Sequence, residues 1–239
     1  MLRKERQEAR IDELLVVGTE RATTVARADG AVRVATVEHL FAALAGLGVR
    51  DGVAIEVAGD ELPLVDGGAS AWVRALESLR LPRARARLVV AREAEIHALG
   101  SVYTFRRADN QVRVHFETGD PRLSCEAVWA HEVHDFAVRI APARTFAFAR
   151  DLHDLAARGL ASHVSPESVV LIAEDTIHAA GAPFSADEPA RHKLLDLLGD
   201  LYLYGGPPEG SVHAVRPGHA ATHQVARRAL ECGALMVRA

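Results

Sequence analysis

The residues with the clearest capacity for chemistry lie in the segment 191–200, RHKLLDLLGD. Read as a helix, it puts His192, Asp196 and Asp200 four residues apart on one stripe, while its leucines turn to other faces. A histidine and a carboxylate at this spacing can both reach one metal ion. By itself the pattern is more often a solvated ion pair on a helix surface. The segment therefore indicates a site only if other parts of the chain supply partners.

Two other segments supply such partners. In the segment 36–40, TVEHL, His39 offers a further metal ligand, and Glu38 stands beside it where a general base is needed. Near the end of the chain, the segment 217–221, PGHAA, carries His219. A zinc hydrolase uses three protein ligands and keeps the fourth position for water. Two histidines and an aspartate, with a glutamate and a third histidine, predict a hydrolytic metal site.

These segments and several others, in this order, resemble the zinc-dependent UDP-3-O-acyl-N-acetylglucosamine deacetylase (LpxC) family of lipid A biosynthesis. The resemblance covers nearly the whole chain. It rests on TVEHLFAALAGLG at 36–48, ELPLVDGGA at 61–69, APARTF at 141–146, RGLA at 158–161, RHKLLDLLGD at 191–200 and PGHAA at 217–221.

The resemblance implies a set of catalytic roles. It implies one Zn²⁺ held by His39, His192 and Asp196. Beside the metal, Glu38 is expected to act as the base toward water and His219 as the acid toward the leaving amine. The two remaining roles are auxiliary: Asp200 is expected to hold His219 protonated, and the hydroxyl of Thr145 to stabilise the oxyanion.

The resemblance also implies substrate contacts. Lys193 is expected to contact the substrate and Phe146 to pack against its sugar. Arg216 is assigned to the nucleotide phosphates, although an arginine before Pro217 in a turn fits a solvent-exposed position equally well. Val164 is assigned to the passage for the acyl chain. The implied substrate is a small molecule, an acylated UDP-amino-sugar.

Composition limits the classes of partner. The 239 residues are 49% hydrophobic and 25% charged, which is ordinary for a globular protein, and the net charge of −4 gives no electrostatic reason to expect nucleic acid. Cys125 and Cys232 lie far apart, outside any metal-binding spacing, and fit a reducing compartment. The sequence lacks an apolar run long enough for a transmembrane helix and has a charged start, so we expect a cytoplasmic enzyme. Peripheral contact with the inner membrane and the oligomeric state stay open.

Hydrophobic periodicity predicts an α+β fold. We expect a first half over 1–80 carrying Glu38 and His39, a proline- and arginine-containing linker over 81–87, and a second half over 88–239 carrying the other site residues. The halves form a duplicated two-layer α/β sandwich with the active site between them. The expected helices are 37–47, 70–79, 150–158, 186–204 and 219–232, and the expected strands are 14–18, 23–26, 32–36, 53–57, 88–95, 102–106, 112–116, 123–128, 168–173 and 212–215.

Other histidines are predicted to be structural or exposed. The segment 130–134, AHEVH, resembles a zincin motif, but its second histidine comes one residue early and a third ligand is missing. We expect surface positions for His213 and His223, which flank the third motif. The same holds for the scattered His97, His115, His153, His163 and His178.

The sequence departs from the family pattern at two places. Only 38 residues precede His39, which predicts missing or shortened strands at the start of the first half. After 158–161, bulkier residues than the family has in its acyl passage follow, among them Val164, Val169 and Leu171. Overpacking a channel costs about 1–3 kcal/mol, so we expect a preference for a short acyl group or an open binding surface. Acyl length and physiological substrate stay undecided.

Two alternatives to the deacetylase remain. A catalytically weak paralogue could keep the fold and serve as a binding or regulatory protein, as the two departures suggest. A zinc amidohydrolase with a different substrate would need the same residues. An active enzyme is favoured, because a binding protein has no chemical need for both a base and an acid, and the chain has the complete set of Glu38, His39, His192, Asp196, Asp200 and His219.

Overall fold

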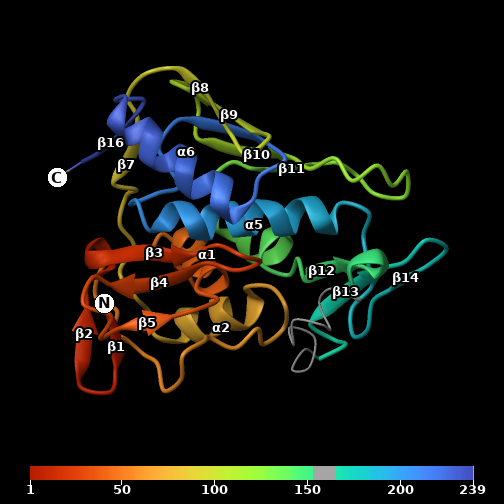
Figure 1. Ribbon diagram of the computed structural model, residues 1–239, viewed down its shortest axis with the longest axis horizontal. Helices are drawn as coiled ribbons and strands as arrows, with labels where there is room; N and C mark the ends of the chain where they lie inside the picture. Colours follow the sequence, from red (N-terminus) through yellow and green to blue (C-terminus); the bar gives the residue numbers. More distant parts are fainter. Residues whose placement is uncertain (153–164, 239) are drawn as a thin grey trace.

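The computed structural model describes residues 1–152 and 165–238 of this mixed α/β protein (Figure 1). The first part of the chain forms two three-stranded sheets, of order β2-β1-β6 and β3-β4-β5, in which only the β1–β6 pair is parallel. Asp29 and Gly30 lie in the turn between β4 and β5, where the backbone of Gly30 adopts a positive φ. The strands are β1 (Leu2–Lys4), β2 (Gln7–Ala9), β3 (Leu14–Gly18), β4 (Thr24–Arg27), β5 (Arg33–Val34) and β6 (Ile55–Glu56).

Two helices accompany these sheets, α1 (Glu38–Gly46) and α2 (Ser70–Ser78). Every residue of α1 is buried, as expected from a run of leucine, phenylalanine and alanine without a polar face. At Gly46 an added Cβ would lie 2.2 Å from the ring of Phe136, so this glycine allows the close approach of the helical segment Phe136–Ile140.

The later part of the chain forms a five-stranded sheet of order β11-β10-β15-β9-β8, in which only the β10–β15 pair is parallel. Helices α5 (Glu188–Tyr202) and α6 (His219–Glu231) pack against this sheet and against each other. The strands are β8 (Ala94–Ala98), β9 (Ser101–Arg106), β10 (Gln111–His115), β11 (Glu126–Trp129) and β15 (Ser211–Val215).

Smaller elements complete the described fold. A three-stranded sheet of order β12-β13-β14 has its own apolar cluster, with Phe146 and Phe148 packed against Val170. Its strands, and those of the separate pair β7–β16, are β12 (Thr145–Phe148), β13 (Val169–Ile172), β14 (Ile177–His178), β7 (Leu88–Val90) and β16 (Leu235–Val237). Short helical segments are Ile11–Glu13, α3 (Val133–Asp135), the π-helical Phe136–Ile140 and Ala149–Asp151.

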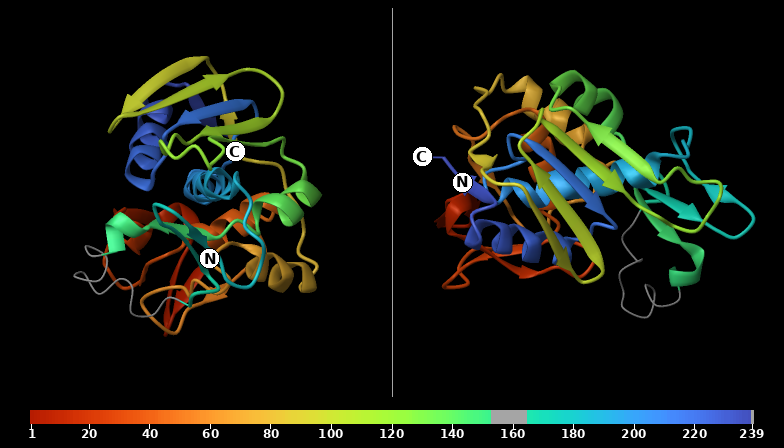
Figure 2. Two further views of the ribbon diagram at one scale, coloured as in Figure 1. Left: turned by 90° about the vertical axis from the view of Figure 1, so that its right-hand side faces the viewer. Right: turned by 90° about the horizontal axis from the view of Figure 1, so that it is seen from above.

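Helix α5 is the centre of the molecule. In the left view of Figure 2 this helix is seen end-on, and it lies between the five-stranded sheet and the elements of the first part of the chain. Its most extensive helix contact is with α1. At Gly199 an added Cβ would lie only 2.0 Å from the backbone oxygen of Glu38, so the two helix backbones touch there. This contact joins the segments that carry the candidate site residues.

Most of the predicted elements are confirmed. The described helices α1, α2, α5 and α6 agree with the predicted ranges within two residues at each end. The predicted strand 88–95 is wrong as one element, because β7 ends at Val90 and pairs with β16, whereas β8 begins at Ala94 in another sheet. Strands β1, β2, β12, β14 and β16 were not predicted, since two to four residues are too few to show alternation. The first part contains five short strands before α1.

Candidate active site

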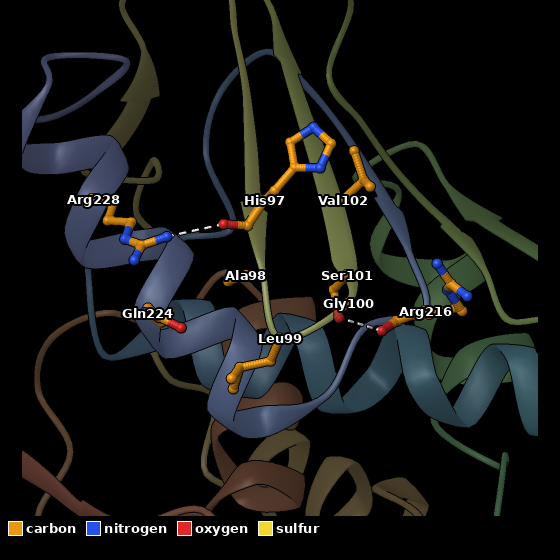
Figure 3. A pocket seen from close by; sticks show the side chains of 9 residues that line it. All are labelled: His97, Ala98, Leu99, Gly100, Ser101, Val102, Arg216, Gln224 and Arg228. Carbon is orange, nitrogen blue, oxygen red and sulfur yellow. Dashed lines mark hydrogen bonds between the residues drawn. The ribbon is translucent and has the colours of Figure 1, made fainter.

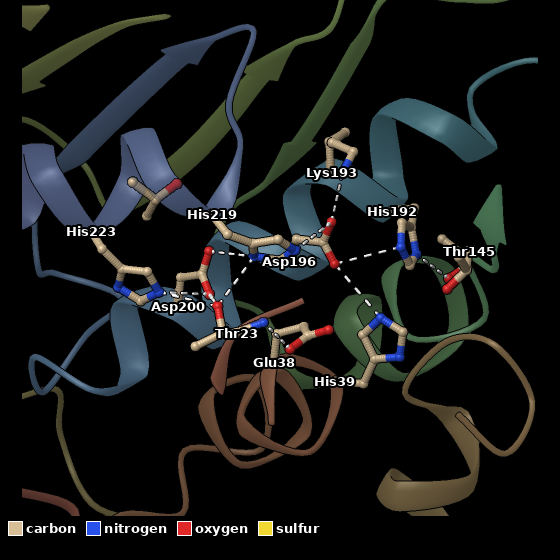
Figure 4. A network of polar contacts seen from close by, with 12 residues as sticks. Thr23, Glu38, His39, Thr145, His192, Lys193, Asp196, Asp200, His219 and His223 are labelled. Atoms are coloured by element: carbon tan, nitrogen blue, oxygen red, sulfur yellow. Dashed lines mark hydrogen bonds and ion pairs between the residues drawn. The ribbon is translucent and has the colours of Figure 1, made fainter. Parts of the chain in front are cut away.

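Three helices and one loop bring the candidate residues together (Figure 4). Glu38 and His39 begin α1, and His219 begins α6. The middle of α5 contributes Asp196 and its neighbours one turn away, while Thr23, just before β4, closes the group from the first part of the chain. Most of these side chains are at most 8% exposed, so the group forms a buried polar centre.

His39, His192 and Asp196 form a candidate metal centre. The Oδ1 atom of Asp196 lies 3.6 Å from Nε2 of His39 and 3.5 Å from Nε2 of His192. One ligand atom from each residue lies within 4.8 Å of the others, and all three residues are buried. These separations are too long for good hydrogen bonds but suit three atoms that surround a common point. The group can hold a metal ion.

The donor atoms fit a divalent cation. Nδ1 of His192 lies 3.0 Å from the backbone oxygen of Ala143 and can donate to it, which leaves the Nε2 lone pair facing Asp196. Burial lowers the pKa of His192 to about 4, so the ring is neutral, as a ligand must be. Nδ1 of His39 is buried without a hydrogen-bond partner among the described residues. Two imidazoles and a carboxylate form the donor set of a hydrolytic zinc centre.

Asp196 also contacts Lys193. Burial opposes its charged form, but the electrostatic interactions with His192 and the ammonium of Lys193 keep the pKa of Asp196 well below its usual range. The ammonium of Lys193 lies 2.8 Å from Oδ2 of Asp196 and 5.7 Å from the ring centre of Phe146. Phe146 in turn meets the His192 ring edge-on at 6.0 Å. Both residues therefore border the candidate metal centre.

Glu38 is held beside this centre by the backbone. The N–H of Thr23 donates to its Oε2 at 2.9 Å, and the side chain is buried. Burial raises the pKa of Glu38, although the electrostatic interactions with His219 and His39 oppose the shift. A raised pKa brings a carboxylate closer to the range in which it can accept and release protons at neutral pH.

The second polar cluster surrounds Asp200, one helical turn beyond Asp196. Nδ1 of His219 lies 2.8 Å from Oδ2 of Asp200, and the hydroxyl of Thr23 donates to Oδ1 at 2.6 Å. Burial opposes the cation of His219, yet the charge and hydrogen bond of Asp200, with the charges of Asp196 and Glu38, raise the pKa of His219 to about 9. His219 is therefore protonated at neutral pH and can donate a proton.

The APARTF segment is anchored on both sides. Arg144 makes a buried, bidentate ion pair with Glu188 at the start of α5, with N–O distances of 2.8 and 3.1 Å. The hydroxyl of Thr145 donates to the backbone oxygen of Gly67 at 3.0 Å. Gly67 has a φ of +80°, and an added Cβ would lie 1.7 Å from the backbone oxygen of Ser168. These contacts fix Ala143 against His192 and Thr145 near the centre (Figure 4).

Arg216 lies outside the buried centre. It lines a surface pocket of about 420 Å³ between the β8–β9 turn and α6, which also holds Arg228 (Figure 3). Its side chain is exposed, its φ is +52°, and its backbone oxygen accepts a hydrogen bond from Ser101 at 2.6 Å. Val164 lies outside the described residues, as do His153 and His163.

The predicted surface position of His223 is wrong. This side chain is 0% exposed and contacts Asp200, because α6 turns residues 219 and 223 toward α5 together. The i,i+4 spacing of His219 and His223 repeats the pattern that identified α5, and could have revealed this residue. His213 is half-buried on β15. The sequence did not identify Thr23 as a site residue, since a threonine before a short strand belongs to no motif that indicates catalysis or metal binding.

The zincin-like segment 130–134 contributes no residue to the candidate metal centre of His39, His192 and Asp196. His131 stacks on Trp129 with ring centres 4.7 Å apart, and His134 is exposed. His97 and His178 are exposed, as predicted, and His115 is half-buried. Among the described helices, none combines the length and apolar character needed to cross a bilayer.

Comparison with known proteins gives consistent matches. The model of the family described as UDP-3-O-acyl N-acetylglycosamine deacetylase matches residues 2–231. A protein of Myxococcus xanthus (strain DK1622) named UDP-3-O-acyl-N-acetylglucosamine deacetylase is 37% identical over 229 residues, covering 90% of this chain and 69% of that protein. Proteins of the same name from Anaeromyxobacter sp. (strain Fw109-5) and Shewanella loihica are 40% and 37% identical, covering 90% and 88% of this chain and 72% of each relative.

Proposed function

Because this chain belongs to the UDP-3-O-acyl N-acetylglycosamine deacetylase family, we propose that it removes the N-acetyl group from a UDP-3-O-acyl-N-acetylglucosamine-type substrate of lipid A biosynthesis. The observation that carries the proposal is the buried group of His39, His192 and Asp196, with Glu38 and His219 beside it. Amide hydrolysis needs a base for the attacking water and an acid for the leaving amine, and this group offers one of each.

The metal in this proposal is Zn²⁺, held by His39, His192 and Asp196. Two neutral imidazoles and one carboxylate suit zinc better than the harder Mg²⁺ and Ca²⁺, which prefer oxygen ligands. When bound, zinc supplies a Lewis acid that lowers the pKa of a water and polarises the amide carbonyl. The ring of His192 is already oriented for this role by the backbone oxygen of Ala143.

Glu38 and His219 divide the proton transfers. Glu38 accepts a proton from the attacking water, and its position is fixed by the N–H of Thr23. His219 gives the proton on Nε2 to the nitrogen of the acetamide as the C–N bond breaks, which yields acetate and a free amine. Asp200, hydrogen-bonded to Nδ1 of His219, stabilises the imidazolium before transfer and keeps Nε2 directed toward the reacting group.

The remaining residues would bind and orient the substrate. The hydroxyl of Thr145, now bonded to Gly67, would rotate to donate to the oxyanion that forms at the carbonyl. Lys193 and Phe146 border the centre and would contact the sugar. The exposed Arg216, three residues before His219, would meet the nucleotide phosphates.

Several finer expectations stay predictions. Residues 1–80 and 88–239 are proposed to be two copies of one α/β sandwich, supported by the pairing of α1 with α5 between their sheets. A cytoplasmic location and peripheral contact with the inner membrane rest on the family's substrate. The preference for a short acyl group, or for an open binding surface, rests instead on the bulkier residues of this chain, of which Val169 and Leu171 are half-buried on one face of β13.

The experiment combines metal analysis with a deacetylation assay. The purified protein should contain one zinc per chain and release acetate from UDP-3-O-acyl-N-acetylglucosamine. His192→Ala should lose both, whereas the exposed His134→Gln should lose neither. A zinc-loaded wild-type protein that releases no acetate would support the binding-protein alternative. Full zinc occupancy in His192→Ala would show that the ligand set is wrong.

A further inference from the structure

A second histidine contacts Asp200 on the oxygen that His219 does not use. Nε2 of His223 lies 3.2 Å from Oδ1 of Asp200, while Nδ1 of His219 lies 2.8 Å from Oδ2. His223 is 0% exposed, and Asp200 is 1% exposed. The carboxylate is therefore enclosed by two imidazoles, one at each oxygen, and the function proposed above assigns a role to only one of them.

His223 is itself held at its other nitrogen. The hydroxyl of Tyr204 lies 3.1 Å from Nδ1 of His223, and the hydroxyl of Thr23 lies 3.1 Å from Nε2. Tyr204 follows the end of α5, and Thr23 precedes β4, so the ring is fixed from two separate parts of the chain. Both nitrogens of His223 thus have partners, as is expected of a buried polar side chain whose orientation matters.

The contacts define the tautomer of His223. The hydroxyl of Thr23 already donates its proton to Asp200, and a carboxylate only accepts, so Nε2 of His223, which faces both oxygens, must carry a proton. Nδ1 can then accept from the hydroxyl of Tyr204. A second imidazolium against the single charge of Asp200 would leave one buried positive charge uncompensated, which is costly. His223 is therefore neutral and protonated at Nε2, with Tyr204 as its donor.

We propose that His223, held by Tyr204, is a positioning residue for the acid half of the reaction. It fixes the plane of the Asp200 carboxylate, so that Oδ2 stays aligned with Nδ1 of His219 and Nε2 of His219 stays directed at the leaving nitrogen. This proposal rests on the deacetylase function. It predicts an effect on turnover, but not on metal content or on substrate affinity, because His223 contacts neither the metal ligands nor the surface that would bind substrate.

The first test compares three variants with matched controls. His223→Leu removes the donor to Asp200, and Tyr204→Phe removes one hydroxyl. His223→Gln retains an amide that can donate from nearly the same point. Hydrogen bonds to charged groups are stronger than those between neutral groups. We therefore expect kcat to fall about tenfold or more in His223→Leu and by a smaller factor in Tyr204→Phe, with KM and zinc content unchanged. His223→Gln should recover most of the rate.

The controls separate positioning from a general loss of packing. Tyr202→Phe removes the hydroxyl of a neighbouring buried tyrosine, which donates to the backbone oxygen of Val49 instead, and should leave kcat unchanged. His134→Gln should do the same on the surface. If His223→Gln is as slow as His223→Leu, or if Tyr202→Phe matches Tyr204→Phe, the proposal is overturned.

A double-mutant cycle tests the route of the effect. In an Asp200→Asn background, His223→Leu should cause no further loss of kcat, because its effect passes through the carboxylate. Losses that multiply would overturn the proposal. ¹⁵N NMR of the wild-type protein, with the His223 signals assigned by their absence in His223→Gln, should show a proton on Nε2 alone. A proton on Nδ1 would overturn the proposal even if one of the variants did not fold.

The outcomes also separate this proposal from the function on which it rests. If the zinc-loaded wild-type protein releases no acetate, the deacetylase function fails, and the positioning role fails with it. If the wild-type protein is active and His223→Leu turns over at the same rate, only the positioning role is overturned.

Discussion

Asp196 and Asp200 are two aspartates one turn apart on α5, yet their surroundings differ. Asp196 faces the imidazoles of His39 and His192 across gaps of 3.5 to 3.6 Å. Asp200 accepts hydrogen bonds of 2.6 Å from Thr23 and 2.8 Å from His219. In the first arrangement the three ligand atoms leave a gap that a metal ion could fill, whereas the second is closed by hydrogen bonds.

Helix α5 thus carries two carboxylates whose surroundings suit them to different chemistry. Both carboxylates are buried and keep a pKa below the usual range, because neighbouring positive charges outweigh burial. What separates them is hydrogen bonding: Nδ1 of His39 has no partner in the described part of the chain, while both oxygens of Asp200 are bonded. The Asp196 cluster can hold a metal ion, and the Asp200 cluster favours the protonated form of His219.

The largest effects on zinc content and turnover are expected when either aspartate is replaced by asparagine. Asp196→Asn removes the only carboxylate of the ligand set, so we expect loss of stoichiometric zinc and of all measurable turnover. Asp200→Asn should keep the zinc and lose about 10²–10⁴-fold in kcat, the size of a general-acid contribution. Metal analysis and kinetics on the same preparations would measure both. Equal zinc loss in the two variants would contradict the separate roles of the Asp196 and Asp200 clusters.

The next effect concerns the pH profile. Glu38 must be deprotonated to act, so the rate should rise with pH through its pKa, which burial raises. His219 must be protonated, so the rate should fall as pH passes its pKa of about 9. A bound cation favours the deprotonated form of each, which moves both limbs to lower pH.

Single variants should remove these limbs one at a time. Glu38→Gln should abolish the acidic limb and His219→Gln the alkaline limb, each with a loss of about 10²–10⁴-fold in kcat and with zinc retained. The limbs of the wild-type profile belong to the coupled site rather than to one residue. A wild-type rate that stays constant between pH 5 and 10 would contradict the paired roles.

The smallest expected effect is that of Thr23, the residue that joins the two clusters. Thr23→Val removes the hydroxyl that donates to Asp200 but keeps the N–H that donates to Glu38, so kcat should fall only about tenfold. Thr23→Ser should stay near the wild-type rate, and zinc affinity should not change in either variant. A fall in zinc affinity in Thr23→Val would mean that the clusters are not independent.

The sequence predicted the parts of this comparison that follow a helical period. His192, Asp196 and Asp200 could be found because one helix aligns them, and the buried α1 because it is apolar on most faces. Thr23 could not be found, since its role depends on where β4 lies in space. Strands β1, β2, β12, β14 and β16 were missed for a similar reason: pairing with other segments, rather than local alternation, makes them strands.

At Gly199 the backbones of α1 and α5 touch, with room for no side chain between them. The two helices therefore cannot separate in a hinge motion without disrupting that contact. Any opening that admits substrate must occur in the loops and small sheet around the helix pair, while Glu38, His39 and Asp196 keep their spacing. The reacting groups are thus arranged during folding, before substrate arrives, so little reorganisation is left for the reaction itself.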